Sequence, residues 1–286
     1  MLYIGKYMRR SYSPSLKDEL ASLSRGSSTS LVNSEGAAAA WGISEPAATR
    51  RLAALTKRGW LRRIKRGTYE ILPIEAVSSV SGSYDDPWVL ASRVFEPCYI
   101  GGWSAAEHWG LTEQLFRETF VVSAASVREK RSTLAGLAFR VARVSRDRAI
   151  GDALVWRQRE QVACSSRERT LVDAANNPSW VGGVRHLAEI LQRYVEDPSR
   201  ELDRLPEILR AFARGSGAKR LGFIAEALAE DERGKGHTNL CEISDVASRF
   251  SKSGVVRLDP ALPVRGRMST RWGLWVNTTI GRRDHS

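Results

Sequence analysis

Eight cationic side chains fall within seventeen residues in the first quarter of the chain. They are Arg50, Arg51, Lys57, Arg58, Arg62, Arg63, Lys65 and Arg66. Guanidinium and ammonium groups at this density can neutralise a row of phosphates, and the planar donor fork of an arginine such as Arg50 also suits the edge of a guanine base. The chemistry that this stretch offers is the binding of a polyanion rather than the breaking of a bond.

A pair of helices and a hairpin would have to present these cations on one surface. An alanine-rich helix is expected to stop at Gly42, and the Ser44 hydroxyl to cap a second helix that has Pro46 in its first turn. The second helix has one apolar face and one small, basic face: Ala48, Leu52 and Leu55 on the first, and Ala47, Arg50, Ala54 and Lys57 on the second. Arg51 and Arg58 flank the basic face, where they would meet phosphates.

The pattern then changes to an alternation of period 2, which is typical of strands. Strands are expected at Trp60–Leu61 and Thr68–Leu72, joined by a tip from Arg62 to Gly67 that holds four of the eight cations. A further helix is expected from Ser15 to Arg25. Helix, turn, helix and basic hairpin in this order predict a winged helix-turn-helix over residues 1–76 that binds double-stranded DNA. An ordinary solvated basic surface is the alternative.

The distribution of charge favours a division of the chain after this module. The 286 residues carry a net charge of +12. Residues 1–72 hold 13 Lys and Arg against 5 Asp and Glu, whereas residues 73–286 hold 31 against 27. Most of the positive surplus therefore lies in the first quarter of the chain, as expected of a polyanion-binding module joined to a nearly neutral body. The polar stretch at residues 77–86 is interpreted as the linker between them.

Residues 87–286 alternate helical and strand patterns, so we expect an α+β fold in which a helical subdomain accompanies a mixed α/β sheet domain. Two capping boxes are expected to start helices there, Ser104 with Glu107 and Ser165 with Glu168. Further helical patterns cover 184–194, 205–213 and 218–229, and closing strands are expected at Val255–Leu258 and Arg271–Val276.

Three segments behind the basic hairpin resemble the AbiEi family, the antitoxin and transcriptional-repressor half of type IV toxin-antitoxin operons, which act in abortive infection as a defence against phage. The segments run from Tyr99 to Thr112, from Ser165 to Asp173 and from Gly217 to Glu226, in the order that the family shows. The resemblance covers nearly the whole chain. The stretch after Gly234 matches no motif of the family.

The resemblance implies a function for each part of the chain. Family members bind inverted repeats in the promoter of their own operon through the winged helix and repress it, and their C-terminal domain neutralises a nucleotidyltransferase toxin. Carried over by position, the helix and wing cations would be the DNA contacts. The antitoxin-domain motifs would contribute Ser104, His108, Arg169, Asp173, Arg220 and Glu226. Direct and indirect opposition to the toxin both remain open, and an internal ion-pair network among the last four residues is the structural alternative.

Catalysis is not expected. No Ser or Cys lies in a nucleophile-elbow context, and neither Gly101-Gly102 nor Gly182-Gly183 has the spacing of a phosphate-binding loop. A metal-dependent nuclease or phosphotransferase, with Glu160, Glu168 and Asp173 around Mg²⁺, is the alternative that the residues leave open.

Cofactors and structural metals are not expected either. Cys98, Cys164 and Cys241 lie far apart with no CxxC pair, and we expect buried or half-buried reduced thiols. No apolar run approaches the ~20 residues of a membrane span, and the N-terminal residues do not resemble a secretion signal. The sequence thus predicts a cytoplasmic protein whose partners are DNA and a toxin rather than a membrane.

Overall fold

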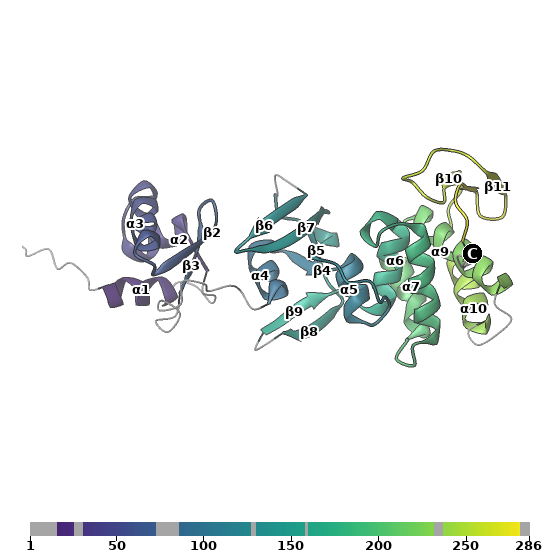
Figure 1. The fold of residues 1–286 in the computed structure, drawn as a ribbon, viewed down its shortest axis with the longest axis horizontal. Helices are drawn as coiled ribbons and strands as arrows, with labels where there is room; N and C mark the ends of the chain where they lie inside the picture. The colour runs from purple at the N-terminus through teal and green to yellow at the C-terminus, as the bar shows by residue number, and fades with distance from the viewer. Residues whose placement is uncertain are drawn as a thin grey trace, which may run out of the picture. The chain divides into compact units, whose positions relative to one another are not determined.

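The computed structural model describes residues 16–25, 31–72, 86–126, 130–157, 160–231 and 237–280. The chain divides into two compact units, Met1–Ser83 and Tyr84–Ser286. Across the described ranges there are ten α-helices and three β-sheets, so the fold is mixed α+β (Figure 1). The expected linker at residues 77–86 lies outside the described residues, except for its last residue. None of the helices in these ranges is long and apolar enough to cross a membrane.

The first unit packs three helices against a small antiparallel sheet. The helices are α1 (Leu16–Arg25), α2 (Ser34–Trp41) and α3 (Glu45–Lys57), and the strands are β1 (Leu31–Asn33), β2 (Leu61–Lys65) and β3 (Thr68–Ile71), in the order β1-β3-β2. Ala48, Leu52 and Leu55 of α3 are buried, as their helical spacing predicts. They join Leu23 of α1 and Tyr69 of β3 in one core.

The turn between α2 and α3 lacks one expected hydrogen bond. Gly42 ends α2 with a φ of 63°, a left-handed conformation that glycine adopts readily. Ser44 occupies the N-cap position of α3, but its side chain makes no capping hydrogen bond, so this expectation is wrong. Pro46 contributes to the difference: as the second residue of the helix it has no N–H, and this removes one of the two donors that an N-cap side chain can accept from.

The hairpin has longer strands and a shorter tip than expected. β2 extends through Arg62, Arg63 and Lys65, and only the next two residues form the turn. Gly67 permits so tight a turn because it adopts a φ of 77°. The register of β2 against β3 shifts between Arg63 and Lys65, as at a β-bulge, and Leu61 and Ile64 are both buried. Three of the four wing cations therefore lie on a strand rather than on a loop.

The second unit contains a six-stranded mixed sheet. Its strands are β4 (Cys98–Ile100), β5 (Glu118–Ser123), β6 (Arg131–Leu134), β7 (Leu137–Arg143), β8 (Ala153–Arg157) and β9 (Glu160–Cys164). The order is β6-β7-β5-β4-β9-β8, with β5/β7 and β4/β9 parallel and the other neighbours antiparallel. α4 (Pro87–Val94) contacts β4, β5 and β9, and α5 (Gly102–His108) contacts β5. β6 and β8 are the two edges of this sheet.

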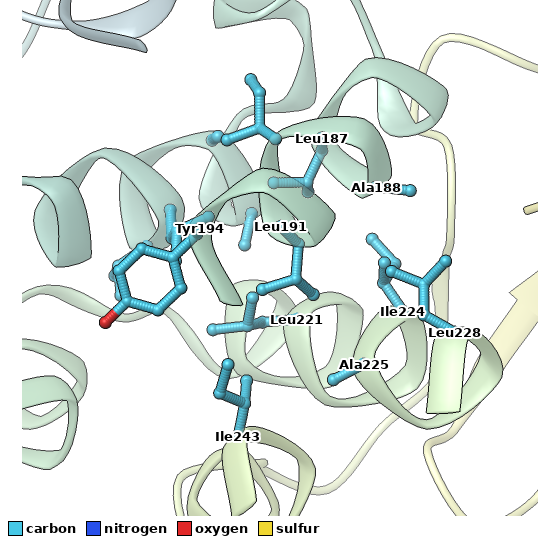
Figure 2. Packing of buried hydrophobic residues seen from close by; sticks show 14 of the residues in the cluster. Leu187, Ala188, Leu191, Tyr194, Leu221, Ile224, Ala225, Leu228 and Ile243 are labelled. Atoms are coloured by element: carbon cyan, nitrogen blue, oxygen red, sulfur yellow. The ribbon is translucent and has the colours of Figure 1, made fainter. Parts of the chain in front are cut away.

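A helical subdomain follows the sheet, as expected. α6 (Arg167–Asn176), α7 (Val184–Glu196), α8 (Leu205–Phe212), α9 (Gly215–Asp231) and α10 (His237–Ser248) share one apolar core. Figure 2 shows how α7 and α9 meet, with Leu187, Leu191 and Tyr194 on one side and Leu221, Ile224 and Leu228 on the other. The apolar stripe of α9 is the one that its helical spacing predicts.

Both expected capping boxes are wrong, although both helices exist. α5 begins at Gly102, two residues earlier than expected, and Ser104 lies inside it, where its Oγ accepts a hydrogen bond from the Phe120 amide of β5 (2.9 Å). α6 is capped by Ser166, and Ser165 forms a hydrogen bond with a threonine inside the helix instead. In each case the serine that was expected to cap the helix makes a different hydrogen bond.

The end of the described chain forms a third, small sheet. It consists of β10 (Val256–Arg257), β11 (Arg267–Ser269) and β12 (Leu274–Val276), in the order β10-β12-β11. The strand expected from Arg271 begins three residues later, because residues 270–273 form a turn. Trp272 projects from this turn into the core that the helices share.

The three cysteines have different environments. Cys164 is buried and Cys98 is half-buried, as expected, but Cys241 of α10 is exposed. None of them forms a disulfide. The expectation was therefore wrong for Cys241, which lies on the outer face of a helix that the sequence analysis did not delimit.

Candidate nucleic-acid interface

Six of the eight candidate DNA contacts are exposed on α3, at its end and on the hairpin. They are Arg50, Lys57, Arg58, Arg63, Lys65 and Arg66. Arg50 and Lys57 are seven residues apart, so they share one face of α3, and Ala54 is exposed on the same face. α3 and β2 are in contact within the unit, so the helix cations and the hairpin cations belong to one packed body.

The side chains next to Arg50 on the outer face of α3 are small. The hydroxyl of Thr49, its exposed neighbour, donates a hydrogen bond back to the Glu45 carbonyl (2.9 Å). Arg50 forms no ion pair with any residue that the structure describes. Its donor fork is therefore available to a phosphate or to a base edge, and no bulky neighbour on this face would hold the helix away from a groove.

Arg51 has a different environment from its neighbour Arg50. Its guanidinium forms an ion pair with Glu19 of α1 and lies over the Trp41 ring of α2, 5.0 Å from the ring centroid. Its side chain is 32% exposed. Because Glu19 already balances its charge, this geometry favours a packing function for Arg51, which joins the three helices.

Arg62 is also engaged inside the unit. Its Nε and Nη2 donate hydrogen bonds to Oε2 of Glu70 at 3.0 and 2.7 Å. The two residues are directly opposite each other on β2 and β3, and Glu70 is buried. A charge-assisted pair of this kind stabilises the hairpin, which leaves Arg63, Lys65 and Arg66 as its exposed cations. The bulge between Arg63 and Lys65 brings Arg62 opposite Glu70, whereas a regular register would place Arg63 there, so sequence spacing alone does not reveal this pair.

In the second unit, Arg169 and Asp173 form a buried ion pair within α6. The distance from Arg169 Nε to Asp173 Oδ2 is 2.9 Å, and the two side chains are 2% and 6% exposed. The Tyr99 hydroxyl of β4 donates to the same carboxylate oxygen (2.7 Å), and the guanidinium lies 3.2 Å from the ring centroid of Phe212 of α8. Burial raises the pKa of the Asp173 carboxyl, and the Arg169 charge opposes this effect. The cluster joins α6 to the sheet and to α8.

Arg220 and Glu226 take no part in this pair, so the expected four-residue network is not present. Arg220 of α9 donates to the carbonyl of Ala175 at the end of α6 (3.1 Å) and to that of Leu258 (3.0 Å). Glu226 accepts a hydrogen bond from Trp272 Nε1 (2.5 Å) and pairs with Arg271 (3.2 Å). The motif residues of α6 and α9 therefore hold separate parts of the fold together.

His108 lies between two tryptophan rings. The centroid of its ring is 5.1 Å from that of Trp88 and 4.5 Å from that of Trp109. Arg157 stands over Trp88 and Arg167 over Trp109, at 4.8 and 4.6 Å from the ring centroids. Partial burial lowers the pKa of His108, and the two arginines lower it further. The rings meet edge to face, and the cluster joins α4, α5, α6 and β8.

The three carboxylates of the metal-site alternative each have other partners. Glu160 pairs with Arg93, and Glu168 accepts hydrogen bonds from the Tyr194 hydroxyl and the Glu201 amide, both at 3.0 Å. Asp173 pairs with Arg169, as described above. In the part of the chain that the structure describes, no group of three or more His, Cys, Asp or Glu residues could hold a metal ion.

No protein-family model matches the chain, and no curated protein matches it. Among solved structures, the chain is similar to the crystal structure of the Rv2827c protein from Mycobacterium tuberculosis. The sequence identity is 17% and the TM-score is 0.49, with 90% of this chain and 89% of that chain covered.

Proposed function

We propose that the first unit is a winged helix-turn-helix that binds double-stranded DNA, with α3 in the major groove and the β2-β3 hairpin as the wing. The observation that supports this most strongly is the set of six exposed cations on α3, at its end and on the adjoining hairpin. Helices and hairpins in this order place one element against base edges and the other against the phosphate backbone.

The cations divide by task in this proposal. Arg50 reads a base edge or an adjacent phosphate, and the small Ala54 lets the helix approach the groove closely. Lys57, Arg58 and the three exposed hairpin cations neutralise phosphates. Arg51 and Arg62 act indirectly, because their ion pairs with Glu19 and Glu70 fix the orientation of α3 and of the hairpin.

We propose further that the whole chain is an antitoxin and autorepressor of the AbiEi type, which binds inverted repeats upstream of its operon and opposes a nucleotidyltransferase toxin. The support is the resemblance of the three motifs in the second unit. Because their residues Arg169, Asp173 and Arg220 are buried, these motifs maintain the fold of the unit, and a surface that acts on the toxin would be formed by other residues.

The salt dependence of DNA binding tests the winged-helix assignment. With a duplex of the upstream promoter, log K should fall linearly with log salt, with a slope of about −5 if all six exposed cations reach phosphates, at about −0.9 per contact. Arg63→Ala combined with Arg66→Ala should make the slope shallower by about two units. Fluorescence anisotropy over a salt series measures both values.

The matched control is Arg210→Ala, which removes an exposed arginine from α8 of the second unit and should leave the slope unchanged. A double hairpin variant that binds with the parental slope would refute the wing assignment.

The antitoxin assignment has its own test: induction of the nucleotidyltransferase from the adjacent reading frame should arrest growth, and co-expression of this chain should restore it. Arrest that persists would refute that assignment alone.

A further inference from the structure

One edge of the six-stranded sheet carries an apolar surface. β8 is the last strand beside β9, and no strand among the described residues pairs with its other side (Figure 1). Leu154 and Trp156 of this strand are 64% and 66% exposed. They are two residues apart, so both side chains stand on the same face of the sheet. Ile150, which precedes the strand, is also 59% exposed.

The two edges of this sheet are protected very differently. On β6, Arg131 lies directly opposite Arg140 of β7 and pairs with Glu118 (3.1 Å), but its side chain is still 71% exposed, so this edge presents a charged group to an approaching strand. The charged residues at the ends of β8 are neutralised internally. Arg157 pairs with Asp86 (2.7 Å), and Asp152 accepts hydrogen bonds from the Ser166 amide and hydroxyl (2.8 and 2.7 Å). An edge strand whose exposed side chains are apolar is one that natural proteins normally cover.

We infer that β8 pairs with β8 of a second copy of this chain, antiparallel, so that the two sheets become one across a two-fold axis. In an antiparallel ladder, alternate residues turn their backbone N–H and C=O groups toward one neighbour and then the other, so half of these groups on β8 face the open edge. When two identical strands pair in this way, every contact is repeated by symmetry, so the backbone hydrogen-bonding groups of both strands are satisfied equally.

The side chains favour the same partner. A register centred on Val155 places Leu154 of one copy opposite Trp156 of the other, and does so twice. An aromatic side chain opposite an aliphatic one is a favourable cross-strand pair, and Arg157, the charged residue of β8, lies opposite Ala153 of the other copy in this register. This inference does not rest on the proposed DNA binding, although a two-fold pair is also the symmetry that an inverted repeat presents.

Sedimentation equilibrium of the full chain without DNA, over a range of micromolar concentrations, tests the inference. We expect a dimer, and we expect Leu154→Lys and Trp156→Lys each to raise its dissociation constant by about tenfold or more, since each change places a charge on both sides of the axis. Leu115→Lys is the matched control. Leu115 is 85% exposed on a loop outside β8, and its substitution should leave the dimer unchanged.

Amide hydrogen exchange provides the second measurement. As the concentration rises, exchange should slow in β8 and not in β6. A monomer at every concentration would overturn the inference, and so would a dimer that both β8 variants preserve or that protects a different segment. Binding to the promoter duplex is measured separately with the same variants. A monomer that still binds DNA would refute the β8 interface and leave the proposed function standing.

Discussion

Arg50 and Arg51 are neighbours in the chain, but Arg50 is exposed and Arg51 is paired inside the unit. The helix turns by about 100° between them, so Arg50 reaches the outer face of α3 while Arg51 meets Glu19 and Trp41. A cation that is paired inside the protein adds little to the neutralisation of phosphates, because binding DNA would first have to break the pair. The number of phosphate contacts in the proposed DNA complex therefore depends on the local partner of each cation and not on the number of cations in the sequence.

The stability of the second unit should depend on pH through His108. Burial and the nearby arginines lower the pKa of this histidine in the folded protein, so the folded chain binds its proton less readily than the unfolded chain. The contribution of His108 to the free energy of unfolding is therefore complete above the pKa of an unfolded histidine, about 6.5, and is lost as the pH falls below it. His108→Phe keeps a ring between Trp88 and Trp109 and should flatten this loss.

Urea titrations of the parent and of His108→Phe, between about pH 5 and pH 8, measure the difference. If the pH dependence of the His108→Phe variant is the same as that of the parent, another group is responsible for it.

At the scale of helices and strands, Gly222 determines how closely α9 approaches the third sheet. A Cβ at this position would collide with the ring of Trp272, whose Nε1 is held by Glu226 at 2.5 Å. On helix propensity alone, Gly222→Ala would stabilise α9 by about 1 kcal/mol. Because the indole would have to move, we expect instead a net loss of about 1–3 kcal/mol in the free energy of unfolding.

Chemical denaturation of the Gly222→Ala variant gives this value. Ala227→Gly, at a half-buried position of the same helix, is the reciprocal control and should cost about 1 kcal/mol from propensity alone. A more stable Gly222→Ala protein would contradict the close packing of α9 on Trp272.

The elements that the sequence predicted well are those with strong local signals. The apolar spacing of α3 and the glycines at positions 42 and 67 depend on nearby residues only, so α3 and the hairpin are found within a few residues of their expected bounds. Ser104 was misassigned as a cap because it bonds to a strand that follows it by 16 residues. Such a contact leaves no trace in local spacing.

The candidate site shows the same distinction. The exposed cations of α3 follow from helical periodicity. The Arg62–Glu70 pair does not follow from the expected hairpin, because it depends on the bulge between Arg63 and Lys65. The pair between Arg51 and Glu19 was not predictable either, since 32 residues separate its members and only the packing of the helices brings them together. The apolar edge of β8 had a period-2 signal in Leu154 and Trp156 that was too short to distinguish from chance.

At the scale of the whole chain, the two units have separate cores, and each should therefore unfold on its own. Leu221→Ala removes a fully buried side chain of the second unit and should cost that unit about 2–5 kcal/mol. Promoter binding by the first unit should persist in this variant. Leu52→Ala, in the core of the first unit, should weaken promoter binding at the same temperature.

Circular dichroism and fluorescence anisotropy on the same samples provide both measurements. If Leu221→Ala and Leu52→Ala abolish promoter binding to the same extent, the units unfold together and their stabilities cannot be assigned separately.

Arg220 gives the last described segment of the chain an importance that its short strands would not suggest. Its guanidinium spans from the end of α6 to the carbonyls of residues 257 and 258, so segments separated by some eighty residues close around one charge. A stop codon before residue 257 would remove two of these carbonyl acceptors and leave the Nε donor of Arg220 without a partner inside the protein. The helices that surround Arg220 would then be destabilised, and such a truncation should cause the entire second unit to misfold.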